Sequence, residues 1–204
     1  MYILHTFMST TSVVTPLIVW GDSLLEMIEK ELAKKVKSTF QVHSYPGLSI
    51  LTCLSDPSLY MPELKNSSDT QNDVDWFISL GTNDQVSQLE WIDLVCSICA
   101  LIVTNPFIRV FYLIPRMYSN RIDLLDLLDY HLEERFKEQV KACLFFDGSE
   151  DDLPLLEDDL LHLNNKGRTQ LCHFIEKVVT QPIQEIQCVP SIQPTCEPPL
   201  NEQP

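Results

Sequence analysis

Four short segments of this sequence carry side chains whose types suit the cleavage of an ester. Ser23 lies in Gly21-Asp22-Ser23-Leu24, where an apolar run ends and an amphipathic run begins. Asp159 and His162 are separated by two residues in an Asp-x-x-His sequence much later in the chain. A serine hydroxyl becomes a strong nucleophile when a histidine takes its proton, and a carboxylate orients that histidine. We therefore predict that Ser23 is a nucleophile, His162 its base and Asp159 the orienting carboxylate.

The other two segments supply hydrogen-bond donors for a negatively charged oxygen. Gly47 follows one apolar run and Asn83 follows the next. A glycine lets a backbone N–H approach a ligand closely, and an asparagine side chain offers an amide donor. We predict an oxyanion hole made of the Ser23 and Gly47 backbone N–H groups and the Asn83 side chain. Loss of one such donor typically lowers the rate about a hundred- to a thousandfold.

Each of these residues also has an ordinary structural interpretation. Serine is a frequent helix N-cap, while Gly47 and Asn83 stand in sequences typical of turns. We favour the chemical interpretation because all the segments occur together, each at or after the end of an expected strand. The orienting carboxylate is not fixed by the sequence, since an acidic run surrounds Asp159. Its other members are Asp151, Asp152, Glu157 and Asp158.

Short apolar runs alternate with helix-length amphipathic runs along the chain. The expected strands are Leu17–Trp20, Thr39–Ser44, Trp76–Leu80, Arg109–Ile114 and Cys143–Phe146. The expected helices are Leu24–Val36, Leu89–Val103, Ile122–Val140 and Lys166–Val179. Between residues 48 and 75 we expect one short helix and a surface loop. Apolar strands separated by helices predict an α/β fold with a parallel sheet covered on both faces.

The length and composition fit one globular domain. We assign residues 15–180 to this domain, residues 1–14 to an N-terminal extension, and residues 181–204, rich in Pro and Gln, to a tail expected to be disordered or a linker. A formal charge of −15 argues against direct nucleic-acid binding, which requires clustered Lys and Arg. We expect an intracellular, cytoplasmic protein, because residues 1–14 make a poor signal peptide and no run is long and apolar enough for a membrane span.

The cysteines and the remaining histidines do not suggest a metal centre. Cys96 and Cys99 form a Cys-x-x-Cys sequence, but they lie in an apolar helical pattern and are expected to be core residues. No cysteine has the spacing of a zinc site. We expect the other histidines to be surface or core residues. They are His5, His43, His131 and His173.

The motifs taken together resemble those of the SGNH, or GDSL-type, esterase and lipase superfamily. The resemblance lies in Gly21-Asp22-Ser23-Leu24, Gly47, Gly81-Thr82-Asn83-Asp84 and Asp159-x-x-His162, which span most of the chain. It implies a flavodoxin-like three-layer α/β/α sandwich with a five-stranded parallel sheet. It also implies that Ser23, Asp159 and His162 form the catalytic triad, and that Ser23, Gly47 and Asn83 form the oxyanion hole. No metal or organic cofactor is needed for this chemistry.

The function predicted from the sequence is therefore that of a serine esterase. It would hydrolyse a small-molecule, lipid or sugar ester, with an acetyl or short acyl group, through an acyl-enzyme. The alternative from another class is a non-catalytic SGNH-like binding or assembly module, encoded by a virus or a retroelement. A flavodoxin-like nucleotide binder ranks lower, because the chain has only five glycines and no glycine-rich phosphate loop.

Overall fold

A five-stranded, fully parallel sheet forms the centre of the molecule. The computed structural model describes residues 15–61, 73–104, 106–116, 121–146, 154–159 and 162–180 of the 204-residue chain. The strands occur in the order β2-β1-β3-β4-β5 across the sheet, and every neighbouring pair is parallel. They are β1 (Leu17–Gly21), β2 (Phe40–Ser44), β3 (Val74–Ser79), β4 (Ile108–Leu113) and β5 (Val140–Cys143). The predicted five-stranded α/β fold is confirmed.

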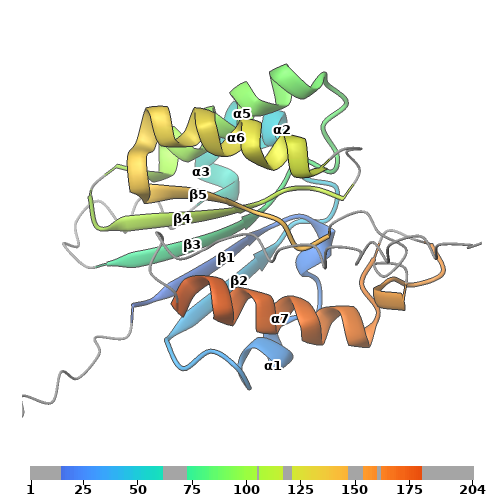
Figure 1. The fold of residues 1–204 in the computed structure, drawn as a ribbon. Coiled ribbons are helices and arrows are strands. Elements are labelled where there is room, and N and C mark those ends of the chain that lie inside the picture. The colour runs from blue at the N-terminus through green and yellow to red at the C-terminus, as the bar shows by residue number, and fades with distance from the viewer. Residues whose placement is uncertain are drawn as a thin grey trace, which may run out of the picture.

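Helices cover both faces of this sheet (Figure 1). On one face lie α2 (Ile50–Ser55), α3 (Pro57–Tyr60), α5 (Gln88–Ile102) and α6 (Arg121–Phe136). On the other lie α1 (Glu29–Leu32) and α7 (Asn165–Thr180), which contact one another. Two single-turn 3-10 helices, η1 (Ser23–Leu25) and η2 (Lys137–Gln139), complete the described elements.

Each face of the sheet has its own apolar core. Trp20, Trp76 and Trp91 are fully buried in the core beneath α5. Val19 and Phe77 point to the opposite core, which α7 closes. Adjacent strand residues therefore serve opposite layers, and this explains why the central strands β1, β3 and β4 are apolar at most positions instead of alternating. Cys96 and Cys99 are buried in the first core, as expected of small apolar side chains.

The expected element boundaries were wrong at three places. The last strand is Val140–Cys143, which begins three residues earlier than predicted. Helix α6 ends at Phe136, and the single turn η2 leads directly into this strand. Lys137 there has a positive φ of 54°, which a helix interior does not allow. The stretch 24–36 is not one helix: Met27 has a φ of 62°, and this separates η1 from the short α1.

The third difference concerns residues 48–75. They contain two short helices, α2 and α3, where one was predicted; the expected surface loop falls largely on residues 62–72, outside the described part of the chain. Asp56 separates the two helices, and Pro57 begins the second. A proline suits the first turn of a helix because its missing N–H has no helical partner there.

The order of the strands creates a crevice next to β1. The chain leaves β1 for β2 on one side and returns to β3 on the other. In open parallel sheets, ligands bind beyond the carboxyl ends of the strands at such a switch point. The turns after β1, β2 and β3 all meet there, and they carry Ser23, Gly47 and Asn83 respectively. The predicted boundaries of the N-terminal extension and of the tail lie outside the described residues.

Candidate active site

The turn that carries Ser23 is held between the two neighbouring strands. The Asp22 N–H donates to the Ser79 carbonyl over 2.9 Å, and the Ser44 hydroxyl donates to the Asp22 carbonyl over 2.9 Å. Gly21 permits this close approach, because a Cβ atom at that position would lie 2.0 Å from the Ser79 carbonyl oxygen. The position of Ser23 is thus set by backbone contacts to both β2 and β3.

Asp22, and not Ser23, is the N-cap of the following 3-10 helix. The Asp22 Oδ1 atom accepts a hydrogen bond from the Leu24 N–H over 3.1 Å, so Asp22 has a structural role in this turn. Its side chain is almost fully buried. Burial raises the pKa of Asp22 to about 6, although the Leu24 N–H and the Thr82 side chain oppose this shift. The Ser23 hydroxyl is left free of the capping role.

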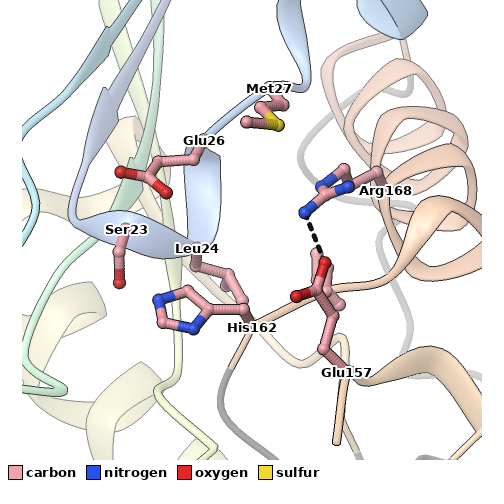
Figure 2. A pocket seen from close by; sticks show the side chains of 8 residues that line it. Ser23, Leu24, Glu26, Met27, Glu157, His162 and Arg168 are labelled. Atoms are coloured by element: carbon pink, nitrogen blue, oxygen red, sulfur yellow. Dashed lines mark hydrogen bonds and ion pairs between the residues drawn. The ribbon is translucent and has the colours of Figure 1, made fainter. Parts of the chain in front are cut away.

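Ser23 and His162 line the same pocket, which has a volume of about 290 Å³. In Figure 2 the His162 ring lies beside the Ser23 side chain, although the two come from opposite ends of the domain sequence. The structure has no hydrogen bond between these two side chains. Contacts of this kind are often long in a site without substrate and shorten when substrate binds. The arrangement brings a hydroxyl and an imidazole to one cavity.

Asp159 is the carboxylate that contacts His162. Its Oδ2 atom lies 2.6 Å from His162 Nδ1, and its Oδ1 atom accepts the His162 backbone N–H over 3.0 Å. The hydrogen bond from Asp159 is the main cause that raises the pKa of His162 above its ordinary value, and the charges of Glu26 and Glu157 add to it. Of the four other acidic residues considered from the sequence, Glu157 pairs with Arg168. Asp151 and Asp152 lie outside the described residues.

A network of backbone contacts holds the loop that carries His162. The Glu157 N–H donates to the His162 carbonyl over 2.8 Å, and Leu156 and Leu163 form an isolated antiparallel bridge. The Asn164 side chain donates to the carbonyls of Pro154 and Leu156 and accepts from the Gly167 N–H at the start of α7. The loop is therefore closed upon itself and fixed to α7.

Gly47 and Asn83 lie in two turns that contact one another. Gly47 is exposed with a φ of 77°, in the left-handed region that favours glycine. The Asn83 side chain donates to the Leu48 carbonyl over 3.0 Å, which links the two turns. This bond uses one of the two Asn83 amide hydrogens, so the other can serve a ligand. Neither residue lines the pocket shared by Ser23 and His162.

Sequence reasoning missed several residues of this region. Asp84 is buried and caps α2. Glu26, Met27 and Arg168 line the pocket. The position of Asp84 directly after Asn83 was a usable signal, whereas the pocket residues come from two segments that only the fold brings together. Of the remaining histidines, His43 lies in β2, and His131 and His173 lie in α6 and α7; His5 is outside the described residues.

Solved structures similar to this chain include esterases and related enzymes. A carbohydrate esterase of family 3 from Talaromyces cellulolyticus is 15% identical, covers 85% of this chain and all of its own, and has a TM-score of 0.58. The catalytic domain of a peptidoglycan O-acetyltransferase from Streptococcus pneumoniae is 12% identical over 83% of this chain and 92% of its own, with a TM-score of 0.54. A candidate SGNH hydrolase from Slackia heliotrinireducens is 16% identical over 81% and 99%, with a TM-score of 0.52.

The similarity is one of structure and is not found at the level of sequence. Neither a protein-family model nor a curated protein sequence matches the chain. The sheet order and the structural matches show that the chain has the fold of the SGNH hydrolases. Among the described helices, none is both long and apolar enough to cross a membrane.

Proposed function

We propose that this chain, which has the fold of the SGNH hydrolases, is a serine esterase that cleaves carboxylic esters through an acyl-enzyme. The observation that carries the proposal is the position of Ser23 and His162 in one pocket, with Asp159 Oδ2 2.6 Å from His162 Nδ1. A nucleophile, a base and a group that orients the base are the minimum set for this chemistry. The supporting structures include carbohydrate esterases and an O-acetyltransferase.

In the first half of the reaction, Ser23 Oγ attacks the ester carbonyl carbon while its proton passes to Nε2 of His162. The carbonyl oxygen becomes an oxyanion, which the Ser23 and Gly47 N–H groups and the free Asn83 amide hydrogen stabilise. When the tetrahedral intermediate collapses, the bond to the alcohol oxygen breaks and that oxygen takes the proton from His162. The acyl group is then an ester of Ser23.

In the second half, a water molecule replaces the alcohol. His162 takes a proton from the water, the hydroxide attacks the acyl carbon, and Ser23 Oγ leaves with the proton that His162 returns. Asp159 stabilises the imidazolium in both halves and keeps its carboxylate charge. We propose an ester of a short acyl group, with acetyl as the leading case, because the similar solved structures include an acetyl esterase and a peptidoglycan O-acetyltransferase.

The test is hydrolysis of p-nitrophenyl acetate by the wild-type chain and by Ser23→Ala. The variant is expected to lose at least about a thousandfold in kcat, with an unchanged circular dichroism spectrum and Tm. Ser97→Ala, which removes an exposed hydroxyl on α5 that bonds to the Asp93 carbonyl, is the matched control and should retain the wild-type turnover. A folded wild-type chain that hydrolyses no ester would instead favour the non-catalytic module.

A further inference from the structure

The proposed chemistry places the two ends of the substrate differently: the carbonyl oxygen faces the oxyanion donors, and the alcohol lies beside His162. Two of the three proposed donors for the carbonyl oxygen, Gly47 and Asn83, do not line the 290 Å³ pocket, whereas Ser23 and His162 do. The atom that His162 must protonate is the oxygen of the departing alcohol. An ester held with its carbonyl oxygen toward Gly47 and Asn83 therefore directs its alcohol into the pocket beside His162.

We propose that this pocket is the alcohol subsite, and that Glu26 makes it select esters of positively charged alcohols; this rests on the function proposed above. Glu26 belongs to the pocket wall next to the nucleophile turn. In Figure 2 its carboxylate lies on the same side of the pocket as Ser23, opposite Arg168. A cation on the alcohol would thus meet a carboxylate close to the reacting atoms.

Among the pocket residues that the structure describes, no positively charged side chain neutralises the negative charge of the Glu26 carboxylate. Arg168 is the only cationic side chain besides His162 among the described lining residues, and its Nη2 atom is 2.8 Å from Glu157 Oε1. That ion pair cancels one positive and one negative charge. Within the described part of the chain, the Glu26 carboxylate has no hydrogen-bond or ion-pair partner. With His162 neutral, as a base must be, the pocket carries one net negative charge.

The apolar lining suits the carbon part of such an alcohol. Leu24, Met27 and Leu163 complete the wall between the charged groups. Methyl or methylene groups around a nitrogen cation can pack against these side chains while the charge faces Glu26. An anionic alcohol would meet the Glu26 carboxylate and the formal charge of −15 of the whole chain, both of which repel it.

Acetylcholine and 3,3-dimethylbutyl acetate test the proposal, because they have the same shape and differ in the positive charge. We expect kcat/KM to be about tenfold higher for acetylcholine at low salt, the effect of about one charge pair near a protein surface. Glu26→Gln should bring the ratio close to one, mainly by lowering the value for acetylcholine. Added salt should reduce the wild-type ratio, since Glu26 is only partly buried.

Glu29→Gln is the matched control. Glu29 is exposed at the start of α1, does not line the pocket, and its substitution changes the net charge equally. The ratio should stay near its wild-type value in this variant. Equal kcat/KM for the two esters in an active wild-type enzyme, or a ratio unchanged by Glu26→Gln, overturns the subsite. Absence of hydrolysis of both esters and of p-nitrophenyl acetate would instead refute the esterase itself.

Discussion

The Asp84 carboxylate accepts hydrogen bonds from the first two backbone N–H groups of α2, those of Ile50 at 2.8 Å and Leu51 at 3.2 Å. The turn after β3, which carries Asn83, is thereby fastened to the turn after β2, which carries Gly47. The Asn83 to Leu48 bond joins the same two turns. Asp84 therefore holds in place the two turns that carry Gly47 and Asn83, two of the three proposed oxyanion donors.

Replacement of Asp84 by Ala should lower kcat much more than it raises KM. We expect a loss of about ten- to a hundredfold, because small displacements of oxyanion donors are costly in the transition state. The free energy of unfolding should fall by about 1–3 kcal/mol, since the Ile50 and Leu51 N–H groups lose their acceptor while the N-cap of α2, Ser49, stays in place. Steady-state kinetics and urea unfolding measure the two effects. An unchanged kcat in a destabilised variant would make Asp84 a purely structural cap.

The raised pKa of His162 predicts the shape of the pH profile. As a base, His162 acts in its neutral form, so kcat/KM should rise with pH through an apparent pKa above the ordinary histidine value of about 6.5. The Asp159 hydrogen bond is the main cause of this shift. Asp159→Asn should move the midpoint to lower pH and reduce the maximal rate by about a hundredfold or more. A midpoint that stays in place after this substitution contradicts the proposed role of Asp159.

The raised pKa of Asp22 predicts that the stability of the protein depends on pH, whether or not the protein is an enzyme. Its folded pKa of about 6 exceeds its ordinary value of 3.8, so the folded state binds more protons between these two values. Stability should therefore fall as the pH rises from about 4 to 6, by at most about 3 kcal/mol from this group. Asp22→Asn, which retains an acceptor for the Leu24 N–H, should be more stable than wild type at neutral pH. Chemical denaturation at several pH values measures the difference, and parallel curves for the two proteins would refute it.

Met27 combines an unfavourable backbone with an exposed side chain. Its φ is 62° and its side chain is 76% exposed, so packing gives little compensation for the left-handed conformation. Met27→Gly should therefore leave stability unchanged or raise it by about 1 kcal/mol, against the usual destabilising effect of glycine. Activity on esters with bulky alcohols should change, because Met27 lines the pocket. A clear fall in the Tm of Met27→Gly would show instead that packing of the Met27 side chain stabilises this turn.

The fold could be predicted from the sequence because the central strands β1, β3 and β4 are continuous apolar runs, separated by longer amphipathic segments. Val19 and Trp20 serve opposite cores, and such unbroken apolar runs distinguish a covered parallel sheet. The boundaries were harder to predict, because Met27 and Lys137 adopt positive φ angles that no local pattern signals in residues other than glycine.

The candidate site could be predicted only in part, because some of its residues are brought together only by the fold. Ser23, Asp159 and His162 stand in short local motifs, so their types and order were visible. Glu26 and Arg168 line the pocket only because α7 packs beside the nucleophile turn, and the sequence places them in unrelated segments. Local motifs therefore indicated the proposed catalytic residues, whereas the other residues that line the pocket could be identified only from the fold.

Intact-mass analysis after reaction with a fluorophosphonate tests the central claim most directly. Only an activated serine attacks the phosphorus atom, so the wild-type chain should gain one adduct, mapped to Ser23 by peptide sequencing. Ser23→Ala should gain none, and His162→Ala should react at least about a hundredfold more slowly. A wild-type chain that remains unlabelled while folded, or one labelled equally well without His162, would contradict the account.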